Sequence, residues 1–289
     1  MEPILKYPGA KWKIAEWIIE RMPPHVGYVE PFFGSGAVFF NKEKSKIETI
    51  ADLDGSIIRF FKTCREHPEE LAYALSLTPW SREEFLRSDF CDSNVDDIEA
   101  ARQFAVRCWQ TFGARTHCKT GWRNTTARTD DPGPDNPKIW RRLPKIVIQV
   151  ADRLLDAQIE NRPAIEVIEH NNGKNVLIYA DPPYMRNTRT LNGDQYRYEM
   201  SDRDHEKLLE ALKKHKGMVL LSGYDSPMYR DMLTGWRMES RKTTAERGVG
   251  RTEFLWSNPA IMEAMPYITD LNYLRRMADA DASDQAKMV

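Results

Sequence analysis

A glycine turn near the N-terminus has the composition of a loop that binds a nucleotide-like ligand. It reads Glu30-Pro31-Phe32-Phe33-Gly34-Ser35-Gly36 and follows a short apolar stretch. Glycine lets the backbone approach a ligand closely, and a helix after the turn would offer unpaired N–H groups. Phe39 stands where the dinucleotide-binding fingerprint has its third glycine, so a turn that only connects two elements is an equally good interpretation.

Two acidic residues, Asp52 and Asp54, end the next apolar stretch, about twenty residues beyond the glycines. In doubly wound sheets an acid at this place accepts hydrogen bonds from the ribose hydroxyls of a nucleotide. Asp54 precedes Gly55 and fits a turn or a helix N-cap equally well. Asp52 is therefore the stronger candidate for ribose binding.

A third segment, Asp181-Pro182-Pro183-Tyr184, directly follows the apolar run VLIYA. A central strand cannot continue through two prolines, so the chain must leave the sheet at the carboxyl end, where open α/β sheets bind ligands. The prolines stiffen the loop and leave nearby carbonyls free to accept from a substrate amine. A carboxylate, a carbonyl and an aromatic ring suit a planar heterocycle with an exocyclic NH₂. A proline turn without a ligand is the weaker alternative.

Alternating strands and helices must bring these segments together. The spacing of apolar residues predicts a helix within residues 11–22, a helix in AVFFNKEK after the glycine turn, and further helices behind the second strand. A capped helix over residues 201–216 is also predicted, with Ser201 as its N-cap. About seven strands are expected, in VGYVEPFFGSG, IETIADLD, AQIEN, KNVLIYADPPY, GMVLLSGYDS, GWRMESRKT and RTEFLWSN.

The alternation lapses between Pro68 and Asp156, where helical patterns alternate with a stretch rich in Gly, Pro and Thr. The prediction is an α/β fold with a mostly parallel sheet interrupted by a mainly helical insertion. We expect a first part of the sheet domain at residues 1–66, the insertion at 67–156, a second part at 157–270 and a tail at 271–289. Trp80, Trp109, Trp236 and His205 are expected to serve the core rather than the chemistry.

Composition limits the class of protein further. The 289 residues are 41% hydrophobic, 10% aromatic and 29% charged, as expected for a chain with a packed core. No apolar run has the ~18 to 20 residues of a membrane helix, and the N-terminus has no export signal, so the cytosol is the expected compartment. Four separated cysteines favour reduced thiols over a zinc site or disulfides, and a monomer is the default expectation.

The net charge of −1 does not by itself indicate a nucleic-acid partner, but the charges are unevenly distributed. The segment from Arg115 to Arg153 contains nine Lys or Arg and four Asp, a net charge of +5. Thr125 and Trp140 lie in the same segment. A solvated loop is the alternative, since charge runs often mean only that. The candidates here for contacting DNA are Arg115, Lys119, Trp122, Arg123, Asn124, Arg128, Lys138 and Arg141. A second group follows the proline loop and comprises Arg186, Asn187, Thr188, Arg189, Arg197 and Tyr198.

The order EPFFGSG, ADLD, a long insertion and ADPPY resembles the Dam-type N6-adenine DNA methyltransferases of the alpha class. YPGAK near the N-terminus, SGYDSPMY and RTEFLWSN are similar to further elements of that family, so the resemblance covers residues 4–66 and 157–258. It implies a class I, Rossmann-like methyltransferase fold and S-adenosylmethionine as the cofactor. It also implies double-stranded DNA as the partner and in-line methyl transfer to N6 of a flipped-out adenine, without a metal.

The resemblance also implies roles for particular residues. Tyr7 and Lys11 would border the cofactor pocket, Phe32, Gly34 and Gly36 would surround the methionine moiety, and Glu30, Pro31 and Ser35 belong to the same loop. Asp52 would hold the ribose, and the cofactor's adenine is expected near Ile159 and Glu160. The target adenine would be held by Asp181, Pro182, Pro183 and Tyr184, with Asp181 also facing the cofactor. Ala10 departs from the family, which usually has a second glycine there.

Other functions remain open from the sequence alone. The same chemistry could act on RNA adenine or on a protein glutamine, and a catalytically silent DNA-binding module is a third possibility. A dehydrogenase is more distant, because the glycine fingerprint is incomplete and the proline loop has no role in hydride transfer. Neither the recognition sequence nor a phage or restriction-modification origin can be read from the chain.

Overall fold

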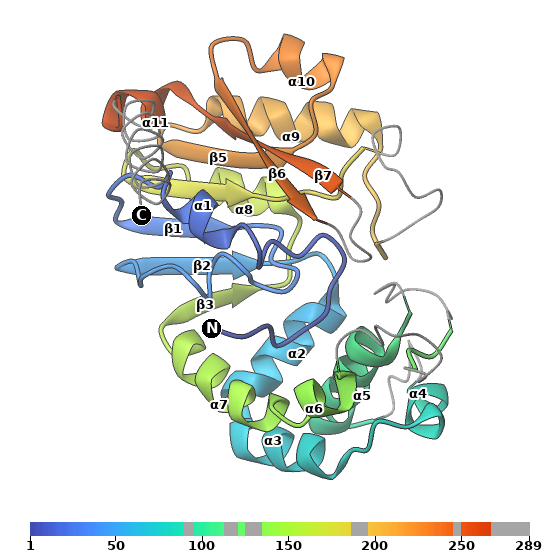
Figure 1. Ribbon diagram of the computed structural model, residues 1–289. Coiled ribbons are helices and arrows are strands. Elements are labelled where there is room, and N and C mark those ends of the chain that lie inside the picture. Colours follow the sequence, from blue (N-terminus) through green and yellow to red (C-terminus); the bar gives the residue numbers. More distant parts are fainter. Residues whose placement is uncertain (89–94, 113–120, 125–134, 186–195, 245–249, 267–289) are drawn as a thin grey trace, which may run out of the picture.

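The computed structural model describes residues 1–88, 95–112, 121–124, 135–185, 196–244 and 250–266. Its centre is one seven-stranded sheet in the order β3-β2-β1-β4-β5-β7-β6 (Figure 1). The strands are β1 (Gly27–Glu30), β2 (Ile47–Ala51), β3 (Ala157–Glu160), β4 (Val176–Ala180), β5 (Met218–Gly223), β6 (Arg237–Thr244) and β7 (Gly250–Ser257). The first five strands in this order are parallel, β7 runs antiparallel to both of its neighbours, and β6 therefore runs in the same direction as the first five, which confirms the predicted α/β class.

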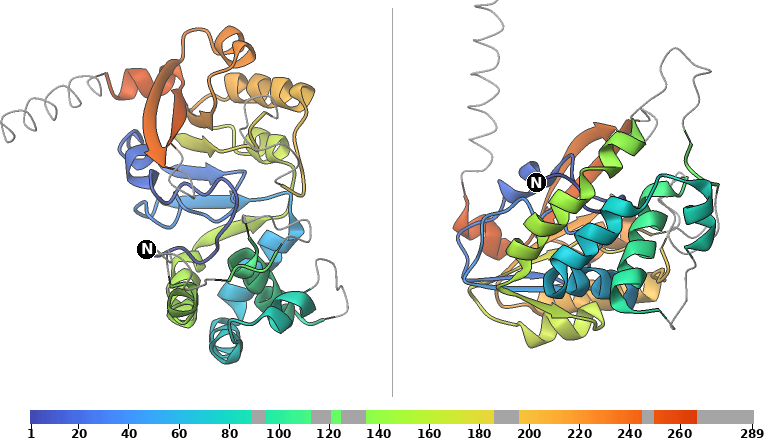
Figure 2. Two further views of the ribbon diagram at one scale, coloured as in Figure 1. Left: turned by 45° about the vertical axis from the view of Figure 1, so that its right-hand side comes forward. Right: turned by 90° about the horizontal axis from the view of Figure 1, so that it is seen from below.

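Helices flank the sheet and occupy most of the described residues between 55 and 154. They are α1 (Ala15–Ile19), α2 (Gly55–Glu66), α3 (Pro68–Leu77), α4 (Arg82–Arg87), α5 (Asp97–Gln110), α6 (Asn136–Trp140), α7 (Leu143–Leu154), α8 (Ala164–His170), α9 (Asp202–Lys214), α10 (Pro227–Met232) and α11 (Pro259–Ala264). Helices α2, α3 and α7 pack side by side (Figure 2). None of the described helices is long and apolar enough to cross a membrane.

Alternation of side chains along the strands creates two core clusters, one on each face of the sheet. Tyr179 and Leu220 point to one face, and Ile178 and Val219 to the other. The first cluster includes residues of α2, α3, α5 and α7, whereas the second is completed by α8, α9 and α10. The helices of the predicted insertion therefore share a continuous core with the sheet.

Polar residues start the helices that matter for the site. The Asp54 carboxylate accepts a hydrogen bond from Ser56 N–H at 2.9 Å, so Asp54 is the N-cap of α2. Ser201 caps α9 as predicted, in a reciprocal capping box with Asp204. These caps satisfy backbone donors at two helix ends that lie beside the carboxyl edge of the sheet.

One predicted helix is absent, and another is shorter than predicted. Residues 37–41 form successive turns instead of a helix, so no helix N-terminus faces the glycine turn. The first helix spans only Ala15–Ile19 within the predicted residues 11–22. Trp109 and His205 are buried, and Trp80 and Trp236 pack against the core, as predicted. Cys64 and Cys108 are buried thiols, and Cys91, Cys118 and the tail at 271–289 lie outside the described residues.

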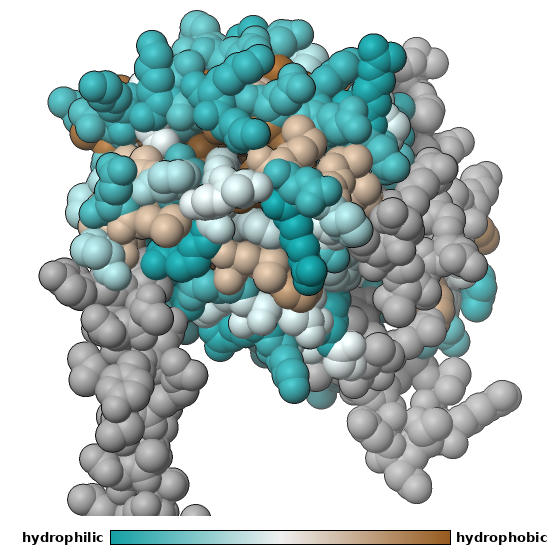
Figure 3. Space-filling model, turned by 90° about the horizontal axis from the view of Figure 1, so that it is seen from above, coloured by the Kyte–Doolittle hydropathy of each residue, from teal (hydrophilic) through white to brown (hydrophobic). Residues whose placement is uncertain are grey.

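The outer surface carries much of the charge counted in the sequence. Seen from above, the described part of this face is mostly hydrophilic, and its apolar side chains gather in small groups (Figure 3). Such a surface is typical of the outside of a folded domain and does not point to a ligand. The carboxyl edge of the sheet is the more informative region.

Candidate active site

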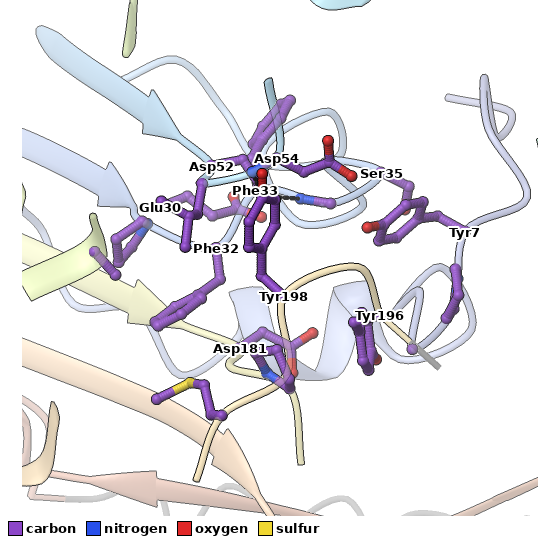
Figure 4. A pocket seen from close by; sticks show the side chains of 18 of the residues that line it. Tyr7, Glu30, Phe32, Phe33, Ser35, Asp52, Asp54, Asp181, Tyr196 and Tyr198 are labelled. Atoms are coloured by element: carbon purple, nitrogen blue, oxygen red, sulfur yellow. Dashed lines mark hydrogen bonds between the residues drawn. The ribbon is translucent and has the colours of Figure 1, made fainter. Parts of the chain in front are cut away.

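A cavity of about 340 Å³ lies at the carboxyl ends of the central strands. Strands β1 and β4 are neighbours, and the sheet order reverses direction between them, which is where open α/β sheets bind ligands. The glycine turn after β1, the acidic turn after β2 and the proline loop after β4 all line the cavity (Figure 4). Of the predicted cofactor residues, those on its wall are Tyr7, Lys11, Glu30, Pro31, Phe32, Gly34, Ser35, Asp52 and Asp181.

Gly36 does not line the cavity, contrary to its predicted place around the methionine moiety. Its φ of +66° is a left-handed conformation, and a Cβ there would lie 2.5 Å from Phe33 and 2.6 Å from Phe40. The second glycine of the turn is thus required for packing behind the loop, whereas Gly34, with φ +50°, faces the cavity.

Asp52 connects the glycine turn to the acidic turn. Its two carboxylate oxygens accept hydrogen bonds from Gly34 N–H and Asp54 N–H, each at 2.9 Å. Burial raises the pKa of Asp52 to about 6, and the backbone hydrogen bond from Gly34 opposes this. Each oxygen keeps a second lone pair that a ligand hydroxyl can use.

Asp181 is held by a lysine from the N-terminal segment. Lys11 Nζ lies 2.8 Å from Asp181 Oδ2 and also donates to the Gly9 carbonyl. The other carboxylate oxygen, Oδ1, is buried and has no hydrogen-bond partner among the described residues. Burial raises the pKa of Asp181, while the charge of Lys11 lowers it. A buried oxygen without a donor is costly unless a ligand supplies one.

The other residues of the proline loop are arranged differently from one another. Pro183 lines the cavity, whereas Pro182 and Tyr184 are buried away from its wall. Tyr184 is 6% exposed, and its hydroxyl donates to Glu253 Oε2 at 2.7 Å. Lys11 Nζ lies 4.8 Å from the centre of the Tyr184 ring. Tyr184 thus belongs to the same cluster as Asp181, although it does not face the cavity.

Residues 196–200 also line the cavity, and of these only Arg197 and Tyr198 were predicted as site residues, for contacting DNA. Tyr196 and Tyr7 approach with ring centres 6.3 Å apart, and both lie at the cavity (Figure 4). Arg197 donates to Ser56 Oγ at 3.1 Å, at the start of α2. Tyr198, predicted to contact DNA, is on the cavity wall. The closely spaced tyrosines after the proline loop were the available signal.

The residues expected near the cofactor's adenine are not on the wall of the cavity. Ile159 packs against the core, and neither it nor Glu160 lines the cavity. Pro163, Ala164 and Ile165 do, together with Leu53. The chain passes the cavity only after β3 has ended, where Pro163 starts α8.

Besides Arg197 and Tyr198, five of the predicted DNA-contacting residues lie in the described part of the chain. Lys138 and Arg141, around α6, are exposed, and so is Asn124. Trp122 and Arg123 are half-buried beside the end of α5, where Trp122 Nε1–H donates a hydrogen bond to Gln110. Trp140 was wrongly grouped with them, since it is 3% exposed and donates to the Thr78 carbonyl within the core. The predictions for Arg115, Lys119, Thr125, Arg128, Arg186, Asn187, Thr188 and Arg189 lie outside the described residues.

Comparison with known proteins decides the family. A family model for the D12 class N6 adenine-specific DNA methyltransferases matches residues 7–246. The chain belongs to this family. The match includes the glycine turn, the acidic turn and the proline loop. It confirms the leading interpretation of the sequence, methylation of adenine in DNA. The alternatives were methylation of RNA adenine, methylation of protein glutamine and a catalytically silent DNA-binding module. The seven-stranded mixed sheet agrees with the class I methyltransferase fold that was predicted and that membership of this family implies.

Related proteins match most of the chain at low sequence identity. The chain is 24% identical to the type II methyltransferase M1.LlaDCHI of Lactococcus lactis subsp. cremoris, over 86% of this chain and 90% of the relative. It is 24% identical to the type II methyltransferase M.MjaIII of Methanocaldococcus jannaschii, over 86% and 92%. A DNA adenine methylase of Vibrio cholerae is 25% identical, over 86% and 92%.

The family assignment makes this chain an N6-adenine DNA methyltransferase that acts on DNA, and it implies S-adenosylmethionine as the methyl donor in general terms. Among the described residues there is no group of three or more His, Cys, Asp or Glu side chains that could hold a metal ion.

Proposed function

We propose that the cavity between the glycine turn and the proline loop binds S-adenosylmethionine and that Asp181 holds the target adenine beside it. The observation that carries this proposal is the presence of Gly34, Asp52 and Asp181 on the wall of one cavity.

The residues on the wall fit such a cofactor. The free lone pairs of Asp52 suit the ribose hydroxyls, and Leu53 and Ile165 offer apolar surface for a planar base. Tyr7 and Phe32 add aromatic surface to the wall of the cavity. When bound, S-adenosylmethionine supplies a methyl group that its sulfonium centre has already activated, so the chain has only to hold and orient the acceptor nitrogen.

Asp181 carries the central role in this proposal. Its unpaired Oδ1 would accept a hydrogen bond from the adenine NH₂, and a proline carbonyl of the loop would accept the second. These two acceptors draw the nitrogen lone pair out of conjugation with the ring, and the carboxylate stabilises the positive charge that develops on the nitrogen. Lys11 keeps Oδ2 occupied, which directs Oδ1 towards the substrate.

The target adenine must leave the double helix to reach this site. We propose that it is flipped out, at a cost of a few kcal/mol, and that the loop around Pro183 and Tyr184 receives it. The region 67–156 would contact the duplex as the recognition part, through the candidates named above, of which Lys138 and Arg141 are exposed.

A single substitution tests the proposal. Asp181→Ala should lower methyl transfer from labelled S-adenosylmethionine to duplex DNA by at least about a hundredfold, because one essential acceptor is lost. Cofactor affinity, measured by calorimetric titration, should change little. Mass spectrometry of the nucleosides should identify N6-methyladenine in the wild-type product. Equal loss of transfer and of cofactor binding would refute the assignment of Asp181 to the target base.

A further inference from the structure

A carboxylate on β7 holds the tyrosine of the proline loop. Glu253 is 5% exposed, does not line the cavity, and accepts the Tyr184 hydroxyl at 2.7 Å. The two residues are 69 positions apart in the chain. A buried carboxylate is expensive to keep in a protein interior, so its position beside the catalytic loop needs a physical explanation.

Arg251 supplies the charge that Glu253 requires. Its Nε lies 2.7 Å from Glu253 Oε1, and the guanidinium carbon lies 5.4 Å from the centre of the Tyr184 ring and 5.2 Å from that of Tyr224. The Tyr184 and Tyr224 rings meet edge to face with their centres 4.6 Å apart. One arginine therefore compensates the carboxylate and packs against the same tyrosine that the carboxylate holds.

These contacts fix what the two prolines leave free. Pro182 and Pro183 restrict the backbone of the loop, but the side-chain torsions of Tyr184 are set only by its neighbours. A phenol that donates to a carboxylate makes a short, strong hydrogen bond, and the edge-to-face contact with Tyr224 restrains rotation of the ring. The Tyr184 ring also lies 4.8 Å from Lys11 Nζ, and Lys11 pairs with Asp181.

We propose that Glu253, supported by Arg251, is a positioning residue that orients Tyr184 and, through Lys11, the Asp181 carboxylate towards the flipped adenine. This inference rests on the proposed function of Asp181 and extends it to β7. Glu253 does not touch the substrate. It acts by holding the Tyr184 hydroxyl, and the Tyr184 ring in turn contacts Lys11, which pairs with Asp181.

The test compares three single variants and the double variant Glu253→Ala with Tyr184→Phe. Glu253→Ala removes the acceptor, Tyr184→Phe removes the donor, and Glu253→Gln keeps an acceptor oxygen without the charge. Duplexes carry 2-aminopurine at the target position, after modified-base sequencing of DNA from expressing cells has identified the methylated sequence. The fluorescence of 2-aminopurine rises when the base leaves the stack, so it reports how the flipped base is held.

We expect Glu253→Ala and Tyr184→Phe each to lower kcat by on the order of tenfold to a hundredfold and to change the fluorescence of the flipped base, with little change in KM for S-adenosylmethionine. The double variant should be no slower than the slower single variant, because both changes remove the same hydrogen bond. Glu253→Gln should recover most of kcat.

Glu239→Ala is the matched control. Glu239 lies on β6 of the same hairpin and pairs with Arg21 at 2.9 Å, far along the chain from the proline loop. Its loss should lower stability without changing kcat or the fluorescence signal. If Glu253→Ala does not fold, Tyr184→Phe and Glu253→Gln decide the matter by themselves.

Two results would overturn the inference. One is a Tyr184→Phe enzyme with wild-type kcat and fluorescence. The other is additive losses in the double variant, which would mean that Glu253 acts independently of the Tyr184 hydroxyl. A wild-type enzyme that binds S-adenosylmethionine but transfers no methyl group to DNA would contradict the proposed function instead.

Discussion

Three of the carboxylates that line the cavity are each stabilised in a different way. Asp181 is paired with Lys11, Asp52 accepts two backbone N–H groups, and Glu30 accepts the hydroxyl of Tyr28 at 2.7 Å. Burial raises the pKa of all three, because each loses contact with water. The effect is large for Glu30, whose pKa rises from 4.5 to about 8.

This shift predicts a pH dependence of stability. Between pH 4.5 and about 8 the folded protein keeps a proton on Glu30 that the unfolded chain has released. Stability must therefore fall as the pH rises through this range, by up to about 1.4 kcal/mol per pH unit from this residue. Glu30→Gln carries no such proton, so its stability relative to the wild type should increase from pH 5 to pH 8. Urea unfolding at several pH values measures the difference, and parallel pH profiles would contradict the prediction.

At the scale of elements, the cavity is closed by segments that helices hold in place. The chain returns from the proline loop across residues 196–200 and enters α9 at the Ser201 cap. Arg197 attaches this segment to Ser56 at the start of α2, next to the Asp54 N-cap. The glycine turn on the opposite side depends instead on close packing of Phe33 and Phe40 against Gly36.

Alanine substitutions at two glycines distinguish the free-energy cost of backbone strain from that of side-chain crowding. Gly36 and Gly235 both have positive φ, +66° and +87°, but a Cβ at Gly235 would meet no heavy atom within 4 Å. Gly235→Ala should cost about 1–2 kcal/mol of unfolding free energy from the left-handed backbone alone. Gly36→Ala should cost about 1–3 kcal/mol more, because its Cβ overlaps two phenylalanine rings. Equal losses in urea unfolding would show that crowding behind the turn is unimportant.

The molecule as a whole is nearly neutral, so binding to DNA must depend on where its charges lie. A buried network of hydrogen bonds joins the helical region to the sheet. The Glu48 carboxylate on β2 accepts one hydrogen bond from Lys42 Nζ at 2.6 Å and one from Nη1 of Arg153, on α7, at 2.5 Å. With the shared core, this network fixes the helices that carry Lys138 and Arg141 relative to the active site.

Salt dependence tests this arrangement. If Arg141 contacts a phosphate, Arg141→Ala should reduce the slope of log K against log salt by about 0.9, since fewer counterions are released on binding. Lys213→Ala is the control, because this exposed lysine lies at the end of α9, which leads away from the cavity. Fluorescence anisotropy with duplex DNA at several salt concentrations measures both slopes. An unchanged slope for Arg141→Ala would remove this residue from the interface.

The sequence by itself determined the class of fold and the three loops of the site. Each loop follows an apolar strand, and the carboxyl ends of parallel strands meet at one edge, so Gly34, Asp52 and Asp181 could be placed together before their coordinates were known. The proline loop was informative because two prolines cannot continue a central strand.

Tertiary structure decided the partners of these residues. Gly36 packs behind its loop instead of facing the cavity, and residues 196–200 line the cavity. Both placements depend on long-range contacts that the local spacing of residues does not encode. The bond between Tyr184 and Glu253 exists because β7 inserts antiparallel beside β5, which brings residues 69 positions apart within 2.7 Å. Strand order is a property of the packed sheet as a whole, and short-range sequence patterns determine strands but not their neighbours.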